Sequence, residues 1–492
     1  MISPTHVLPQ RQIWVVFGGL MLGSFLSALD QTVVATALPT IVRDLGTASE
    51  LSWVVTAYLL TSTVATGLWG KLSDLYGRKP IYLACTTIFL LGSALAGLSQ
   101  SMLELIVFRA LQGIGGGGLL VLAQTIIGDI VSPRARGRYQ GLFGAVFGVA
   151  SIAGPLVGGF LVDNFSWHWV FYVNLPIGLL SLGVTALALP TTSSPRRARV
   201  DWTGAALLML ATTALVLLAS LGGTKLPWSG APIISLGVVA VLAGAAFVQA
   251  QRTADEPVLA PGLFAHPVFA VGSVLSFVVG AIMLGSISYL PTYLQTVKGA
   301  SATASGLWLL PLIAGLLLTS TAGGLIVSRT GRYKALPILG FGVSTAGLFL
   351  MSTMGVDTPL LSIAAYLFVF GFGLGLVMPV LTVAVQNVVR SADLGAATSG
   401  VSFFRSVGSV IGVTVFGAIY ANSLVANLSG SAGAAPAQAY ADALHNVFVG
   451  VLPVAALAFL LSWFLEEVPL RSTRVESDPD SGDSSDQQLQ AA

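Results

Sequence analysis

The chain contains 492 residues, of which 55% are hydrophobic and only 9% are charged, and its formal net charge is +2. Soluble globular proteins carry about 25% charged residues, so this composition excludes a protein with a water-facing surface on every side. The single cysteine, Cys85, excludes a disulfide framework and a structural zinc cluster. We expect membrane lipids around the protein, and neither a cofactor nor a nucleic-acid partner.

Long apolar segments predict an all-α polytopic membrane protein with fourteen transmembrane helices, because about 20 apolar residues cross a hydrocarbon core. The first seven predicted spans cover residues 13–38, 51–69, 80–98, 103–126, 139–162, 167–189 and 203–221. The next seven cover residues 232–250, 268–290, 304–327, 335–355, 359–388, 396–421 and 445–465. The first span is too long for a signal peptide and no cleavage pattern follows it, so we expect it to be retained.

Basic side chains divide unevenly between the two sets of alternate loops. One set contains most of the loop lysines and arginines, whereas the other contains only Arg43, Lys225 and Lys298. The positive-inside rule places the first set in the cytoplasm, with both termini on that side and an even number of spans. We therefore expect a multi-pass protein of the cell (plasma or inner) membrane.

Two distant parts of the chain match at one fixed spacing. The segment 70–79 follows the second span and corresponds to 324–333 after the tenth, and the same spacing aligns glycines of the fifth and thirteenth spans. Transporters are often built from such repeats. We therefore predict an N-terminal six-helix bundle (1–190), a two-helix insertion with its cytoplasmic links (191–255), a C-terminal six-helix bundle (256–470) and a disordered acidic cytoplasmic tail (471–492).

The loop after the second span combines glycines with charged residues, namely Gly70, Asp74, Gly77, Arg78 and Lys79. Glycines let two helix ends approach closely, and a carboxylate can pair with a basic partner at a cytoplasmic bundle interface until the interface opens. The alternative is a positively charged turn that only fixes topology, although the positive-inside rule does not require Asp74 or Gly70. In the second copy Ser328 replaces the aspartate, so we expect a weaker charge latch there or none.

Small residues also recur inside the spans. The fifth span contains Gly148, Gly154, Pro155, Gly158 and Gly159. Small side chains at these spacings let helices pack closely and Pro155 permits a bend, which favours a role in transport, with ordinary packing as the alternative. The glycine-rich segment 109–118 lies within an apolar span and follows no strand, which excludes a nucleotide-binding loop.

Taken together, these segments resemble a known family. The segments 70–79 and 109–118 resemble motifs of the major facilitator superfamily, and 148–159 is similar to the motif shared by its antiporters. The segments 29–39 and 167–176 are similar to the fourteen-span drug:proton antiporter family, which includes QacA- and EmrB-like exporters. The resemblance implies the major facilitator fold, two six-helix bundles plus a two-helix insertion, and proton-coupled antiport.

Ionisable groups inside the spans are few, and each costs about 2.5 to 3.5 kcal/mol at a helix centre on insertion scales, so they are functional candidates. Asp30 and Arg109 lie at similar depths, ~12 and ~9 Å from the outer ends of their spans. We predict a proton-coupling site at Asp30 modulated by Arg109, with a purely structural salt bridge as the alternative. Arg405 lies deep in the thirteenth span and either faces the inner cavity or extends toward backbone carbonyls, and both orientations stay open.

These features favour a proton-coupled antiporter that exports hydrophobic drugs or antibiotics by alternating access. Trp53 and Tyr58 are possible cavity residues, whose rings would contact a lipophilic substrate and attract a cationic one. A native lipid or a secreted natural product is the alternative substrate. A channel fits the paired repeats less well, and no cluster of His, Asp or Glu within the spans suggests an enzyme.

Overall fold

The computed structural model describes residues 9–45, 51–190, 201–223, 226–430 and 436–470. Over these ranges the chain forms helices joined by turns, and it contains no β-strand. The predicted acidic tail (471–492) and most of the first predicted cytoplasmic link (191–200) lie outside the described residues.

The helices follow one another in three groups. The first group comprises α1 (Gln10–Leu45), α2 (Leu51–Tyr76), α3 (Arg78–Ala96), α4 (Met102–Ile130), α5 (Pro133–Asn164), α6 (Trp169–Tyr172) and α7 (Asn174–Ala188). The second comprises α8 (Trp202–Leu221) and α9 (Ala231–Thr253). The third comprises α10 (Pro261–Phe264), α11 (Pro267–Ile287), α12 (Leu290–Thr296), α13 (Ala302–Leu307), α14 (Leu310–Thr330), α15 (Ala335–Ser352), α16 (Leu360–Val388), the 3-10 turn η2 (Ser391–Asp393), α17 (Leu394–Gly430) and α18 (Pro436–Ser462).

Most of these helices fit a membrane. Within the described residues, 13 helical segments are long and apolar enough to cross it, so the predicted all-helical membrane architecture is confirmed. The helix α2 is not one of the 13, although its 26 residues are sufficient in length. Five threonines and serines interrupt its apolar run, at positions 56, 61, 62, 63 and 66. The count of fourteen spans therefore stays a prediction.

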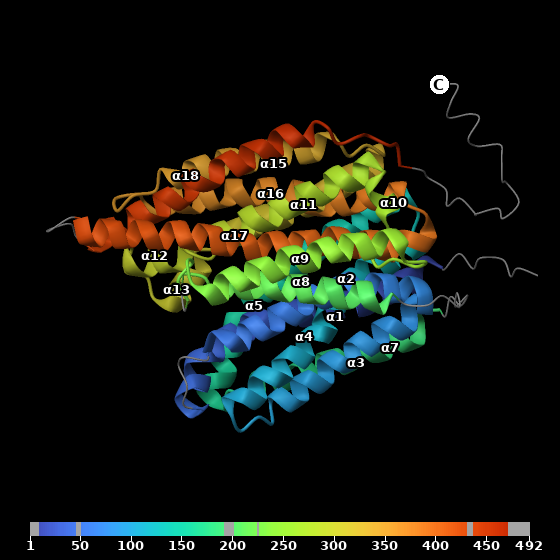
Figure 1. Ribbon diagram of the computed structural model, residues 1–492, viewed down its shortest axis with the longest axis horizontal. Helices are drawn as coiled ribbons and strands as arrows, with labels where there is room; N and C mark the ends of the chain where they lie inside the picture. The colour runs from blue at the N-terminus through green and yellow to red at the C-terminus, as the bar shows by residue number, and fades with distance from the viewer. Residues whose placement is uncertain (1–8, 46–50, 191–200, 224–225, 431–435, 471–492) are drawn as a thin grey trace, which may run out of the picture.

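The helices gather into two large bundles (Figure 1). In that view α1, α3, α4 and α7 lie below, and α11, α15, α16 and α18 lie above. Buried apolar side chains follow the same division, because one large core draws on residues 268–470 and two further cores draw on residues 13–189 and 28–171. The exact domain boundaries predicted from the sequence stay predictions.

The pair α8 and α9 lies across the front of this view and touches both bundles. Leu208 of α8 shares a small apolar core with Phe403 of α17. Lys71 of α2 forms an ion pair at 2.5 Å with Glu256, which follows α9. The two inserted helices are therefore attached to both sides of the junction between the bundles.

Glycines determine how closely α4 packs. All the glycines at positions 113 and 115–118 are buried. A Cβ at position 115 would lie 2.5 Å from the Cys85 carbonyl oxygen of α3, and a Cβ at 117 would overlap the Ser62 carbonyl oxygen of α2. This glycine run is therefore a helix-packing surface between α2 and α3 and not a phosphate-binding loop.

Glycines also bring the two bundles together at one end of the molecule, which we call the gate end. Gly70 of α2 faces the backbone of Gly395 of α17, and Gly324 of α14 faces the backbone of Gly141 of α5. These residues correspond to one another in the predicted repeat. The crossings α2–α17 and α5–α14 are thus two versions of the same contact.

The turns at the gate end show the same correspondence. Gly77 lies between α2 and α3 with a φ of 94°, and Gly331 lies between α14 and α15 with a φ of 72°. L side chains rarely adopt a positive φ, so glycine is favoured at both turns. Position 77 and position 331 are also equivalent in the predicted repeat.

Candidate functional site

A buried ion pair lies inside the first bundle. Arg109 of α4 donates a hydrogen bond from Nη1 to Oδ2 of Asp30 of α1 at 2.6 Å. Asp30 is 0% exposed and Arg109 is 1% exposed. The structure thus brings together the two charges that the sequence placed at similar depth.

Two neutral amides complete the surroundings of the Asp30 carboxylate. Its Oδ1 accepts from Gln112 Nε2 at 2.8 Å and from Asn174 Nδ2 at 2.9 Å. Arg109 also donates to Gln112 Oε1 at 2.7 Å. Side chains from α1, α4 and α7 therefore meet at one carboxylate, so a change in its charge affects contacts among three helices.

Sequence reasoning missed both amides. Gln112 lies one helical turn after Arg109 on the same face of α4, which is a usable signal. Asn174 is the first residue of α7. It lies in the segment 167–176, whose similarity to the drug:proton antiporter family did not by itself indicate a contact with Asp30. Asn174 Oδ1 is buried and meets no partner among the described residues.

Aromatic rings enclose the guanidinium of Arg109. Its Cζ lies 4.3 Å from the centroid of the Tyr58 ring and 5.9 Å from that of Phe171. Tyr58 is buried, and its hydroxyl lies 3.1 Å from Ser27 Oγ. The structure therefore places Tyr58 beside the ion pair, whereas Trp53, the other possible cavity residue, is partly exposed on α2. A cavity role for either residue stays a prediction.

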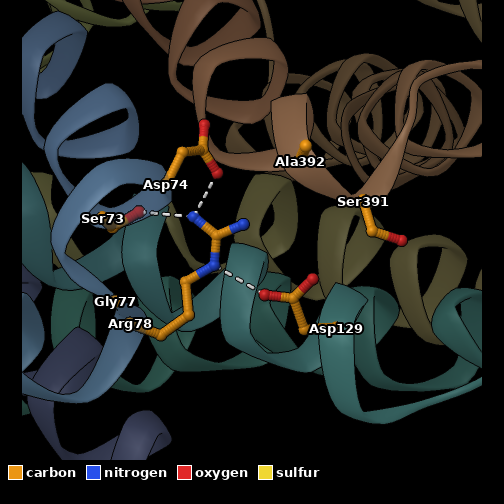
Figure 2. A pocket seen from close by; sticks show the side chains of 7 residues that line it. All are labelled: Ser73, Asp74, Gly77, Arg78, Asp129, Ser391 and Ala392. Atoms are coloured by element: carbon orange, nitrogen blue, oxygen red, sulfur yellow. Dashed lines mark hydrogen bonds and ion pairs between the residues drawn. The ribbon is translucent and has the colours of Figure 1, made fainter. Parts of the chain in front are cut away.

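A second charged cluster lies at the gate end (Figure 2). Arg78 pairs with Asp74 at 2.5 Å, with Asp129 of α4 at 2.6 Å and with Ser73 Oγ at 2.6 Å. These side chains line a cavity of about 110 Å³ together with Gly77, Ser391 and Ala392. Lys79, the remaining charged residue of the motif, is partly exposed in the first turn of α3.

Asp74 also binds the other bundle. Its Oδ1 accepts from the Gly395 amide at 3.0 Å and its Oδ2 accepts from the Ala396 amide at 2.7 Å. These amides belong to the first turn of α17, where unpaired N–H groups and the helix dipole favour a negative charge. Gly70 allows this approach, because a Cβ there would overlap the Gly395 carbonyl and the Ser399 side chain.

The equivalent crossing uses the opposite charge. Arg134, near the start of α5, donates from Nε to the Ser328 carbonyl at 2.9 Å and from Nη2 to the Arg329 carbonyl. These carbonyls lie in the last turn of α14, where the helix dipole favours a cation. We expected a weaker charge latch or none because position 328 is neutral, and the charge comes instead from the opposing helix.

Behind these latches, glutamines fill the junction between the bundles. Gln140 Nε2 of α5 donates to the Gln124 carbonyl of α4 at 3.2 Å and contacts Gln386 Oε1 of α16 at 3.4 Å. Gln386 Nε2 donates in turn to the Gln124 carbonyl at 3.2 Å and to Thr398 Oγ1 of α17 at 3.0 Å. All four side chains are buried, so the bundles are in contact beyond the rim of the gate.

The small residues of α5 contact different neighbours. A Cβ at Gly148 would lie 2.7 Å from Ile313 of α14, in the other bundle. A Cβ at Gly154 would overlap the side chain of Thr32 of α1, and one at Gly158 would lie 3.1 Å from the Val33 carbonyl oxygen. Gly159 has nothing within 4 Å of the position of a Cβ, and Pro155 lies within the helix.

Arg405 lies on α17 and is partly exposed. Among the described residues, no hydrogen bond or ion pair reaches its guanidinium. The sequence left open whether Arg405 faces the inner cavity or extends toward backbone carbonyls, and no contact with a carbonyl supports the second orientation. The described residues also contain no group of three or more His, Cys, Asp or Glu residues that could hold a metal ion.

Comparisons with known proteins agree with this architecture. The sequence matches the Major Facilitator Superfamily over residues 20–413. An uncharacterized MFS-type transporter of Mycobacterium tuberculosis is 44% identical over 492 residues, which cover 95% of this chain and 72% of that protein. Multidrug resistance protein 3 of Bacillus subtilis is 38% identical over 445 residues, which cover 89% of this chain and 87% of that protein. The solved structure of the proton:xylose symporter XylE matches with a TM-score of 0.67 and 17% identity, covering 94% of this chain and 98% of that one, which supports the fold alone.

Proposed function

Because the chain belongs to the Major Facilitator Superfamily, and is therefore a membrane transporter rather than an enzyme, we propose that it is a proton-coupled antiporter that exports hydrophobic molecules. The superfamily assignment rests on the match over residues 20–413. The relatives named as multidrug transporters support efflux. Proton coupling, direction and substrate are our proposals.

The buried Asp30 carboxylate is the observation that carries this proposal. A carboxylate inside a membrane protein is costly unless it is paired, and Asp30 is paired with Arg109, Gln112 and Asn174. Protonation removes the negative charge that attracts Arg109 and turns one acceptor oxygen into a donor. The three helices that meet at Asp30 then lose their common partner, so proton binding favours a different arrangement of the bundle.

Alternating access supplies the second part of the mechanism. We infer that the gate end faces the cytoplasm, that α2 is a fourteenth span and that both termini are cytoplasmic, in agreement with the distribution of basic loops. The contacts of Asp74 with α17 and of Arg134 with α14 then hold the cytoplasmic side closed. Opening that side has to break both sets of contacts. The contacts of Arg134 are exposed, so water can replace them, whereas the Asp74 side chain is only 4% exposed and becomes hydrated as the gate opens.

The energy available is sufficient for export of a neutral molecule. One proton entering down ~100 mV supplies about 2.3 kcal/mol, and one pH unit adds about 1.36 kcal/mol. The sum of about 3.7 kcal/mol sustains a gradient of roughly 500-fold at one proton per molecule. A cation exchanged for one proton cancels the voltage contribution, so it reaches only about tenfold per pH unit.

Two experiments test this function in sequence. Expression in a drug-hypersensitive host against a chemically diverse panel identifies an exported compound. The purified protein in proteoliposomes should then accumulate that compound against its gradient only when a proton gradient is imposed. Transport that dissipates the substrate gradient but never exceeds equilibrium, whatever the pH difference, would contradict antiport.

A further inference from the structure

Arg405 is a charged side chain in the middle of α17, and the described residues supply no counter-charge for it. It lies about 16 Å along the helix from Leu394. Its guanidinium meets no carboxylate, carbonyl or aromatic ring among the described residues. In contrast, Arg109 in the first bundle is neutralised by Asp30 and enclosed by two rings.

The acidic residues of the second bundle are too few and too peripheral to neutralise this charge. Between residues 267 and 462 the sequence contains only Asp357, Asp393 and Asp442. Asp393 lies before the start of α17 and pairs with Arg390 at 2.9 Å. An unpaired charge inside a membrane protein is costly and usually faces a cavity or a functional partner. The counter-charge of Arg405 is therefore left for a bound molecule.

The face of α17 that carries Arg405 is polar, and one end of it reaches the junction between the bundles. Thr398, Ser402, Arg405 and Ser409 follow one another at spacings of three and four residues, which places them on one side of the helix. Thr398 at one end of this row accepts a hydrogen bond from Gln386 at 3.0 Å. Gln386 belongs to the layer of glutamines that joins the two bundles.

The neighbours of Arg405 fix its backbone and leave a second polar group free. Ser409 Oγ donates to the Arg405 carbonyl at 3.0 Å, and a Cβ at Gly280 of α11 would overlap that carbonyl. The α17 backbone is therefore packed directly against α11 at this point. Ser402 is 5% exposed, and its Oγ is buried without a partner among the described residues.

We propose that Arg405 and Ser402 form an anion-binding point on the transport path, and that the exported substrate is a hydrophobic molecule bearing a carboxylate. A guanidinium binds a carboxylate through two parallel N–H···O bonds, and the Ser402 hydroxyl donates a further one. The inference rests on the proposed export function, and it changes the expected substrate charge from cationic to anionic. Export of an anion in exchange for a proton gains from the membrane potential twice, since both movements carry positive charge inward.

Equilibrium binding tests the proposal without any proton gradient. The full-length protein in phosphatidylcholine nanodiscs is titrated by calorimetry with three probes of one scaffold: 1-naphthoate, its methyl ester and 1-naphthylmethylamine. The variants are Arg405→Gln and Arg405→Lys, and the matched control is Arg43→Gln, which removes an arginine whose side chain is 78% exposed. Size-exclusion chromatography checks that each variant is folded.

We expect the wild-type protein and Arg43→Gln to bind naphthoate at least tenfold more tightly than the ester and the amine. Arg405→Gln should weaken naphthoate binding by about 10- to 100-fold, as expected for loss of charge-assisted hydrogen bonds, and leave ester binding unchanged. Arg405→Lys should retain part of the preference, because it keeps the charge and loses the paired geometry. The titration imposes no proton gradient, so a failure of proton coupling leaves this result intact.

Three results would overturn the proposal. The first is a wild-type protein that does not prefer naphthoate to its ester, including one that binds neither. The second is an Arg405→Gln protein in which all three probes are weakened equally. The third is displacement of naphthoate when phosphatidylglycerol is added to the nanodiscs, which would assign Arg405 to a lipid headgroup.

Discussion

Replacing Asp74 by asparagine should open the gate end. The carboxylate accepts two amide hydrogen bonds from the other bundle, at 3.0 and 2.7 Å, and pairs with Arg78 at 2.5 Å. Asparagine keeps one acceptor oxygen, but it loses the charge and turns an NH2 group toward the second amide. Hydrogen bonds to a charged group contribute about 1.5–3 kcal/mol each, so loss of one and weakening of the other amounts to about 2–4 kcal/mol. The ratio of closed to open gate should fall by roughly 30- to 700-fold.

Cysteine labelling measures this ratio directly. The only native cysteine, Cys85, is buried and gives a low background. Ser399 is 0% exposed and faces Gly70 across the gate, so a Ser399→Cys side chain becomes accessible only when α2 and α17 separate. The rate of labelling by a hydrophilic maleimide, applied to inside-out vesicles, should rise steeply in Asp74→Asn.

The repeat provides the matched control for this experiment. Ser328→Ala changes the residue that occupies the place of Asp74 in the second copy. Only the backbone carbonyl of Ser328 contacts Arg134, so the substitution should leave labelling near the wild-type rate. Similar labelling rates in Asp74→Asn and Ser328→Ala would refute the latch.

Two further predictions concern α5. Gly154→Leu should abolish transport, because the added side chain would overlap Thr32 of α1. Gly159→Ala is the control and should have little effect on transport, because nothing lies within 4 Å of its Cβ position. Wild-type efflux by Gly154→Leu would show that close packing is not needed. A Ser320→Cys probe reports on the α5–α14 crossing, where Ser320 faces Gly141. Arg134→Gln should raise its labelling rate by about fivefold or less, because exposed contacts of a charged group contribute up to about 1 kcal/mol. An unchanged rate would show that Arg134 does not hold the gate closed.

The buried charges were predictable because the membrane makes them costly. Asp30 and Arg109 are conspicuous in apolar spans, and their depths follow from helix rise alone. Their contact requires only that α1 and α4 turn these faces toward each other. Gln112 and Asn174 are less conspicuous, because a neutral amide is common at many positions and its role depends on the rotation of α4 and α7.

The gate was only half predictable from the sequence. Asp74 and Arg78 lie close together in the sequence, and they pair across the turn at Gly77 that separates α2 from α3. Asp74 also accepts hydrogen bonds from the backbone amides of Gly395 and Ala396. Every residue except proline has such an amide, so the sequence does not show which amides Asp74 binds. The contact of Arg134 with the end of α14 was unpredictable for the same reason, because its acceptors are backbone carbonyls, which every residue has.

The two inserted helices show what amino-acid pattern alone leaves open. Their lengths and hydropathy predict spans, and both form long helices. Their position against α2 and α17 depends on side chains far apart in the chain, such as Leu208 beside Phe403 and Lys71 beside Glu256. Composition and hydropathy do not indicate which residues far apart in the chain come into contact.

Substrate-induced proton release tests the central role of Asp30 most directly. Asp30→Asn leaves Arg109 buried without its counter-charge, which destabilises a protein by about 3–5 kcal/mol in comparable cases, so the double variant Asp30→Asn/Arg109→Gln is examined in parallel. Asp44→Asn serves as the matched control, because that side chain is 48% exposed.

The measurement uses purified, folded protein and a pH-sensitive dye, with a substrate identified by the drug panel. We predict that wild-type protein and Asp44→Asn release protons when substrate is added, and that Asp30→Asn and the double variant release none while still binding substrate. Undiminished proton release from Asp30→Asn would contradict the account, because a residue other than Asp30 would then carry the proton.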